Sequence, residues 1–309
     1  MDFGVHGHSM ASMQQPNTRR ASRSRQDWHR RRTLVAALND ESESGVQVLN
    51  FNEAFMRSFG MQHPALRRFV DGACQLLSPA SSVDAQRTGH RILQLAWNEY
   101  YAAVGDGEEA KSHFTRASVA AGACVSPRMN TAPNCVHFAL GARIGAPSTA
   151  EDPDGHIPAM LNRALVGFIR TRPDGRNECV MTTVFPELLS DLGFGRAPQP
   201  AAGDVVVYTL VKASDATPGV ALTEHAVHFG LVVECPPSST HVMIESKSGY
   251  AFATYIHPVD VVDPTYLIEA PIMRTHYFRP LRPPLATSEL ALVAHRYEAR
   301  VMSMARGDG

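Results

Sequence analysis

The hydrophobic pattern of the chain changes its period once, and this change limits the possible folds more than any other feature. Between residues 34 and 120, apolar side chains recur every three to four residues, as in the run from Leu66 to Leu77, which predicts amphipathic helices. From residue 203 onward, short β-branched and aromatic runs alternate with Gly, Pro and Ser clusters, as is typical of antiparallel strands. Helices first and strands later favour an α+β fold.

The same pattern predicts the boundaries of the parts. We expect an Arg/Ser-rich tail over 1–33, a helical region over 34–120, a catalytic domain over 121–285 and a C-terminal helix over 286–309. Within the helical region, Ser82 is the expected N-cap of one helix, and the Gly-rich stretch 102–107 ends it. The expected strands are 205–211, 228–234, 241–247, 251–257 and 275–280.

Composition excludes some classes of function. The 309 residues carry a net charge of −1 and are 44% hydrophobic, which argues against a chain that as a whole coats nucleic acid or an anionic membrane. No apolar run approaches the ~20 residues of a membrane span, and the N-terminus lacks a secretory signal pattern. Residues 1–33 hold seven arginines: the alternatives are a solvated disordered tail, a signal-less secretion leader or an organelle presequence. Location therefore stays open between the cytoplasm and signal-less export.

Cysteine and histidine usage points away from metal and disulfide chemistry. The five cysteines are odd in number and too sparse for a disulfide scaffold, so at least one thiol is free or pairs outside the chain. The 14 histidines are scattered, with no H-E-x-x-H or paired C-x-x-C motif, and no Gly-rich phosphate loop is present. We expect no cofactor and no metal. Four cysteines are expected to be packing residues: Cys74, Cys124, Cys179 and Cys235.

Cys135 is the expected exception. The segment NCVHFALG follows a Pro-punctuated loop and leads into an apolar helical run, so the thiol is predicted at a helix N-terminus, where the dipole and free N–H groups lower its pKa. His228, predicted to open a strand, is the candidate general base, and Glu245 on the next strand is the first candidate to orient its ring. His225 competes with His228, but we expect the two to point to opposite faces of the strand.

Two further polar residues, one close to Cys135 in sequence and one at the start of a predicted strand, are expected to have structural roles. His137, two positions after the candidate nucleophile, is interpreted as a hydrogen-bonding residue of the helix start. Asp204 follows Gly203 at the start of a predicted strand and is expected to shape that turn.

Four segments in order carry a family resemblance: NCVHFALG, AAGDVVVY, HFGLVVE and HVMIESKSG. Together they resemble the papain-like NlpC-type and CHAP-type cysteine hydrolases over roughly residues 128–280. The NCxHF box is also similar to the lecithin:retinol acyltransferase branch, although that branch places its histidine before the cysteine. The segment after Glu245 is similar to an S-K-W-G…H-P segment of CHAP-like proteins, with Ser248 in place of the Trp.

The resemblance implies a papain-like fold, in which a nucleophile helix packs on an antiparallel sheet. It maps Cys135 to the nucleophile and His228 to the base, and it leaves the third polar position between Glu245 and His257. The expected enzyme is a thiol peptidase or amidase that forms an acyl-enzyme. Its expected substrate is an amide bond of a peptide, a protein or peptidoglycan, and nucleic acid is not an expected partner.

Two other interpretations remain. The same dyad could serve an acyltransferase or a deamidase, and the fold could instead be a non-catalytic binding module whose basic tail contacts RNA or a membrane. The tail's composition also suggests an effector delivered by a specialised secretion system. The sequence does not predict the oligomeric state.

Overall fold

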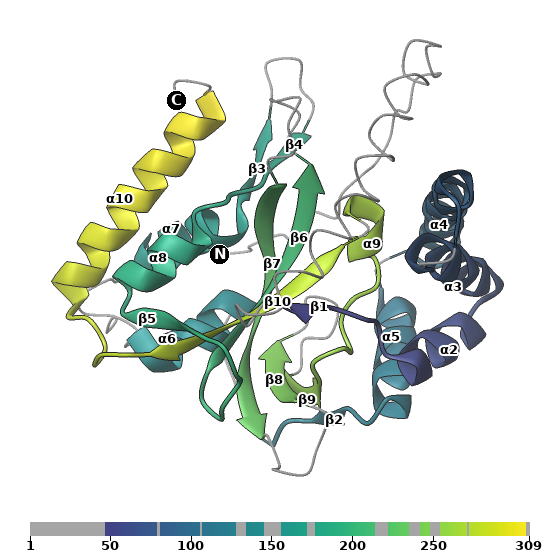
Figure 1. The fold of residues 1–309 in the computed structure, drawn as a ribbon, viewed down its shortest axis with the longest axis horizontal. Coiled ribbons are helices and arrows are strands. Elements are labelled where there is room, and N and C mark those ends of the chain that lie inside the picture. The colour runs from purple at the N-terminus through teal and green to yellow at the C-terminus, as the bar shows by residue number, and fades with distance from the viewer. Residues whose placement is uncertain are drawn as a thin grey trace.

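The computed structural model describes residues 47–78, 81–105, 107–127, 134–144, 156–171, 177–213, 222–234, 242–247, 254–270 and 272–306. In this part of the chain, an eight-stranded antiparallel sheet is combined with helices on both sides (Figure 1). The α+β class expected from the sequence is therefore confirmed. The tail 1–33, with its proposed roles, lies outside the described residues, as do Ser248 and Cys235.

The helices fall into two groups along the chain. The first group contains α2 (Glu53–Met61), α3 (Pro64–Leu77), α4 (Val83–Val104) and α5 (Glu108–Ala120). The second contains α6 (Cys135–Ile144), α7 (His156–Val166), α8 (Phe185–Asp191), α9 (Tyr266–Glu269) and α10 (Thr287–Arg306). None of the described helices is both long enough and apolar enough to cross a membrane.

The main sheet runs in the order β1-β10-β6-β7-β8-β9-β2, and β5 also pairs with β10. Its strands are β1 (Gln47–Val48), β2 (Cys124–Val125), β5 (Phe194–Ala197), β6 (Val205–Ala213), β7 (Leu222–Glu234), β8 (Met243–Lys247), β9 (Thr254–Pro258) and β10 (Met273–Pro280). A separate hairpin consists of β3 (Phe168–Thr171) and β4 (Asn177–Val180).

The local signals for helix ends are confirmed. Ser82 caps α4, and its side chain accepts a hydrogen bond from Ala85 N at 3.2 Å. Gly105 ends α4 with φ of 72°, a backbone conformation that glycine adopts without strain. The predicted helical stretch 34–120 is partly wrong, because Gln47 and Val48 form a strand that pairs with β10.

Each predicted strand is present, with shifted ends. The largest shift concerns β7, which begins at Leu222. His228 therefore lies inside the strand rather than opening it, which corrects the sequence prediction. The turn before β6 has the expected form: Asp204 Oδ2 accepts from Ala201 N at 2.8 Å, and both carboxylate oxygens accept hydrogen bonds from Arg279.

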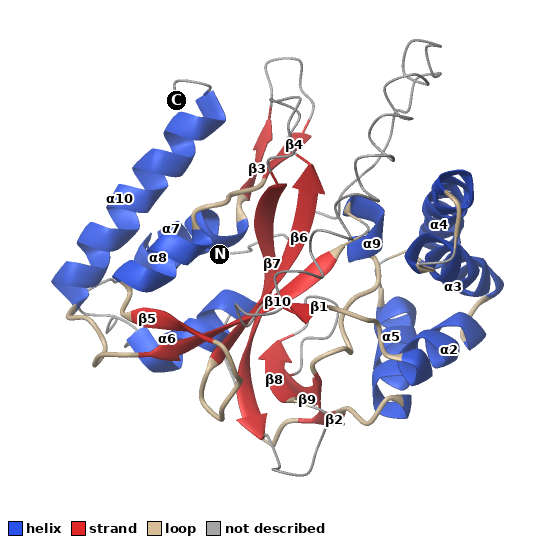
Figure 2. Ribbon diagram, viewed as in Figure 1, coloured by secondary structure: helices blue, strands red, loops and turns tan. Residues whose placement is uncertain are grey.

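The sheet lies between two groups of helices, with α7, α8 and α10 on one side and α2–α5 on the other (Figure 2), and its two faces belong to different apolar cores. On one face, Val207 and Phe229 pack in a core with residues of α6, α7, α8 and α10. On the other face, Tyr208 and Ile244 pack with residues of the loop before α9. Each face of the sheet is therefore covered by the chain itself. Burial of apolar area is the main source of stability for both cores.

The first helical group is tied to the sheet at several points. Val261, which follows β9, and Leu267, in α9, both belong to the core of α2–α5. His90 Nε2 of α4 lies 3.2 Å from the carbonyl oxygen of Ile268. In sequence, these helices lie between β1 and β2, which occupy opposite ends of the strand order. Helical region and sheet therefore share contacts, and the domain boundary at 120/121 stays a prediction.

Candidate active site

The start of α6 is fixed by a side-chain cap. Asn134 Oδ1 accepts a hydrogen bond from His137 N at 3.0 Å and lies 2.9 Å from His137 Nδ1. Because an amide oxygen only accepts, the ring nitrogen must donate in this contact. This arrangement makes Cys135 the first residue of the helix, as predicted. It also agrees with the structural role expected for His137.

The thiol of Cys135 packs against the core on the α6 side of the sheet. Burial raises its pKa, and the N–H groups of Phe229, Val136 and Cys135 itself act in the opposite direction without reversing the shift. The expectation of a lowered pKa is therefore wrong, because the loss of hydration exceeds the effect of the helix N-terminus. The thiol is nevertheless surrounded by three backbone donors.

His228 lies on the other face of the sheet. It is paired with Tyr208 of β6, and the two ring centroids are 5.5 Å apart. Burial lowers the pKa of His228 to about 3, and the neighbouring His257 contributes to the same shift. The ring is therefore neutral at physiological pH. No hydrogen bond joins Cys135 to His228 in the described structure.

Glu245 also faces away from His228. Gly230 is paired with Ser246 and Leu231 with Glu245, and directly paired residues share a face while neighbours along a strand alternate. Ser246 therefore lies on the face of His228, and Glu245 on the face of α6. There, the carboxylate of Glu245 accepts a hydrogen bond from the Ser126 hydroxyl.

A bulge changes the relation of the two candidate bases. His228 is paired with Tyr208 and His225 with Leu210, with an irregularity between these pairs. Tyr208 and Leu210 belong to the same core, so His225 and His228 occupy register positions on one face. The predicted opposition of the two histidines is wrong, because the extra residue, Val227, breaks the alternation. His225 Nδ1 lies 3.2 Å from the carbonyl oxygen of Thr182.

The face of His228 carries a pocket with a volume of about 220 Å³. Its polar lining includes His228, Ser246, His257, Ser118 and Asp263. Ser246 Oγ and His257 Nε2 are 2.7 Å apart, and His257 Nδ1 is 2.8 Å from the carbonyl oxygen of Pro258. The structure thus brings His228 and His257 together in one pocket, and Glu245 and Cys135 do not line it.

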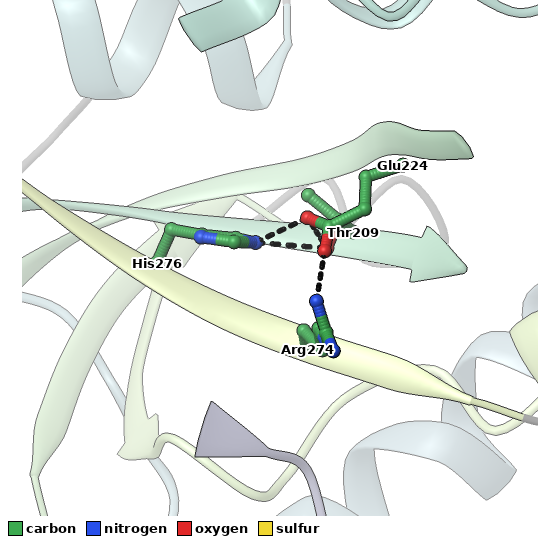
Figure 3. A network of polar contacts seen from close by, with 4 residues as sticks. All are labelled: Thr209, Glu224, Arg274 and His276. Carbon is green, nitrogen blue, oxygen red and sulfur yellow. Dashed lines mark hydrogen bonds and ion pairs between the residues drawn. The ribbon is translucent and has the colours of Figure 1, made fainter. Parts of the chain in front are cut away.

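A second polar cluster lies on the α6 side of the sheet (Figure 3). Glu224 contacts Arg274, lies 2.6 Å from His276 Nε2, and accepts a hydrogen bond from Thr209 at 3.3 Å. Burial alone raises the pKa of Glu224, but the hydrogen bond and charge of His276, followed by Arg274, outweigh it and lower the pKa to about 2. Arg274, His276 and Thr209 are buried, so this cluster is a structural ion-pair network.

Sequence reasoning missed Ser246 and Ser118 as members of the pocket. A signal for Ser246 existed: on the predicted strand 241–247 it lies two residues after Ile244, so the two side chains point to the same face. Ser118 gave no such signal, because the sequence around a helical serine does not indicate which strand that serine will face. Among the described residues, no group of three His, Cys, Asp or Glu side chains is placed to hold a metal ion.

Comparison with protein-family models, with curated proteins and with solved structures finds no match to this chain.

Proposed function

We propose that the protein is a cysteine hydrolase with a papain-like active site, in which Cys135 attacks the carbonyl carbon of an amide and His228 is the general base. The proposal rests on the ordered motifs of the sequence and on one structural observation. Cys135 is the first residue of a helix that packs against the sheet, and the backbone N–H groups of Phe229, Val136 and Cys135 itself favour the thiolate. The same groups are suited to stabilise the oxyanion of a tetrahedral intermediate.

The end of one strand ladder defines the place where thiol and imidazole can meet. The described pairing between β7 and β8 ends at Gly230 and Ser246, and the next amide along β7, that of Phe229, donates toward the thiol. His228 is the residue before Phe229. In this proposal, its ring turns past the end of the ladder toward Cys135 when substrate binds, because catalytic contacts often tighten only in the complex.

Two residues are candidates for the third polar position, and they lie on different faces of the sheet. His257 lines the pocket of His228 and lowers the pKa of that ring, whereas Glu245 lies on the face of α6 and contacts Ser126. If His228 acts from its pocket, His257 is its neighbour. If His228 turns toward Cys135, it approaches the face of Glu245. Variants of the two residues separate these alternatives.

The substrate class follows from the motifs: an amide bond of a peptide, a protein or peptidoglycan, cleaved through an acyl-enzyme. The acyl-enzyme passes to water in a hydrolase and to another nucleophile in an acyltransferase. Analysis of the products therefore distinguishes these reactions. Delivery as an effector is part of the proposal and rests on the composition of residues 1–33 alone.

The test is site-resolved labelling of the full chain with a thiol-directed acyl-mimicking electrophile, read by peptide mass spectrometry. Cys74 and Cys124 are exposed free thiols and serve as internal references within each sample. We expect the adduct at Cys135 to form more slowly by about two orders of magnitude in His228→Ala, with unchanged labelling of the two references. His225→Ala is the matched control.

Turnover gives the second measurement. We expect amide hydrolysis, assayed on purified peptidoglycan and on a protein mixture, to disappear in Cys135→Ala. Turnover that survives Cys135→Ala would overturn the assignment of the nucleophile. Equal labelling of Cys135 in wild type and in His228→Ala would overturn the assignment of the base.

A further inference from the structure

The pocket on the far face from Cys135 contains a serine and a histidine in hydrogen-bonded contact. The carbonyl oxygen of Pro258 can only accept, so His257 Nδ1, 2.8 Å away, must carry the proton. His257 Nε2 therefore presents its lone pair, and Ser246 Oγ, 2.7 Å away, donates to it. Burial lowers the pKa of His257, which keeps the ring neutral. A hydroxyl that donates to an oriented, neutral imidazole is the arrangement of an activated serine nucleophile.

One further polar group of the pocket lacks a partner. Ser118 Oγ is buried and forms no hydrogen bond in the described structure, and Ser118 itself is 3% exposed. A buried polar group without a partner costs roughly 1–3 kcal/mol. This unsatisfied hydroxyl in the pocket of Ser246 is suited to a ligand that brings its own oxygen atom.

The rest of the lining is largely apolar and includes Phe114, Tyr255, Val262 and Tyr266. Asp263 is the one carboxyl in the lining; burial raises its pKa, while hydrogen bonds from Thr265 act in the opposite direction. Among the described residues, the lining holds no Lys or Arg, so none of these side chains favours an anionic ligand. A neutral ligand with a carbonyl oxygen and a short apolar part matches this surface.

We propose that Ser246 and His257 form a second nucleophile–base pair, which hydrolyses small, uncharged carboxylic esters in this pocket. The site is separate from the Cys135 site, because Cys135 packs on the other face of the sheet. A pocket of about 220 Å³ is below the roughly 300–1,000 Å³ of sites for drug-sized ligands. The acyl group is therefore short.

The chemistry balances with water as the only co-substrate. Ser246 Oγ bonds to the ester carbonyl carbon while its proton passes to His257 Nε2, and the carbonyl electrons move to the oxygen. The tetrahedral intermediate collapses, the C–O bond to the alcohol breaks, and the leaving alkoxide takes the proton from His257. Water, deprotonated by His257, then attacks the acyl-serine and releases the carboxylic acid. Ser118 Oγ, which has no partner in the described structure, is the available donor for the oxyanion.

The experiment uses the full chain and a fluorophosphonate probe, which bonds to activated serines. Peptide mapping of the labelled wild type is expected to find the adduct on Ser246. Labelling is expected to be lost in Ser246→Ala and to slow about 10²-fold or more in His257→Gln, because glutamine can hydrogen-bond to the hydroxyl but cannot act as a base. Ser190→Ala, an exposed serine of α8 outside the pocket, is the control and should keep the labelling.

Ester turnover supplies the substrate test and separates the two proposals. We expect hydrolysis of p-nitrophenyl acetate and butyrate, much slower hydrolysis of the octanoate, and retention of fluorophosphonate labelling in Cys135→Ala. An adduct on another residue, or no adduct in the wild type, overturns the proposal. So does equal labelling of wild type and His257→Gln. Loss of amide turnover in Cys135→Ala with intact Ser246 labelling supports both sites independently.

Discussion

At the scale of single residues, Cys135 shows how two effects compete at one sulfur atom. Its position at the start of α6 and the N–H of Phe229 favour the thiolate, but burial raises the pKa of Cys135 more than these donors lower it. The resting chain therefore holds a neutral thiol, and the neutral His228 ring lies on the other face of the sheet. In the proposed reaction, the base must therefore act as the substrate is attacked.

This state predicts the pH dependence of alkylation. The rate of iodoacetamide addition to Cys135 should keep rising above the ordinary thiol pKa of roughly 8.5, because only the thiolate reacts. Replacing Cys74 and Cys124 with serine isolates the signal from the other exposed free thiols of the described chain. A rate that reaches its plateau near neutral pH would contradict the buried, protonated thiol.

Glu224 is the residue with the clearest link between charge and stability. Its pKa is lowered to about 2 in the folded chain, against roughly 4.3 unfolded. The carboxylate therefore contributes stability that is fully present above the unfolded value and is lost as the pH falls toward 2. At 1.36 kcal/mol per pKa unit, the loss is about 3 kcal/mol.

Urea unfolding at several acidic pH values measures this contribution. We expect the free energy of unfolding to fall more steeply with acidification in the wild type than in Glu224→Gln. The variant should also be less stable at neutral pH, because the anion that contacts Arg274 and His276 is removed. Parallel pH profiles of the two proteins would show that Glu224 does not carry this linkage.

At the scale of elements, α6 depends on one capping residue. Asn134→Ala removes the side-chain acceptor for His137 N, and the expected cost is about 1 kcal/mol of unfolding free energy. Asn134→Asp keeps an acceptor oxygen and should lose much less. Thermal unfolding of the two variants provides the measurement, and equal midpoints for Ala and Asp would rule out the cap as the cause.

The packing of α3 on α4 depends on two glycines. A Cβ atom at Gly72 would lie 2.7 Å from the carbonyl oxygen of Gly89, and one at Gly89 would lie equally close to that of Gly72. Gly72→Ala should therefore push the helices apart and lower stability by about 1–3 kcal/mol. Gly141→Ala in α6 is the control, because its Cβ would have open space. We expect it to be neutral or to stabilise by up to ~1 kcal/mol; similar losses for both variants would contradict the close approach.

Elements with a strong local signal were predictable from the sequence. Ser82 and Gly105 marked the ends of α4, and the β-branched run 205–211 marked β6. The bulge at Val227 was not predictable, because it arises from pairing with β6 and leaves no periodic mark in β7. That one residue decides the faces of His225 and His228. The residue types of the candidate site could be read from the sequence, but not which of them share a face of the sheet: His228 and His257 line one pocket, and Cys135 and Glu245 lie on the other face.

At the scale of the whole molecule, the helices α2–α5 are an excursion between two strands of one sheet. Strand β1 precedes them and β2 follows them, at opposite ends of the strand order. The sequence predicted the succession of helices and strands but not this arrangement, because pairing between Gln47 and Thr275 has no local signature. Because helices α2–α5 and the sheet share contacts, each part is expected to be less stable without the other.

We therefore expect helices and sheet to unfold in one cooperative transition. Trp97 lies in α4 beside Phe69, with ring centroids 5.9 Å apart, and reports on the helices once Trp28 is replaced by Phe. Its fluorescence should follow the same urea dependence as the far-ultraviolet circular dichroism of the whole chain. Separate midpoints for the two signals would mean that the helical region unfolds on its own.

The pocket is lined by residues of the first helical group and by residues of the sheet. Phe114 and Ser118 belong to α5, while Ser246 and His257 belong to the sheet. A small rotation of the helical group would therefore widen or narrow the cavity and leave the Ser246–His257 pair and the strand register unchanged. In the proposed site, substitutions of Phe114 on α5 would therefore alter which molecules fit without changing the Ser246–His257 pair, so selectivity and reactivity could change separately.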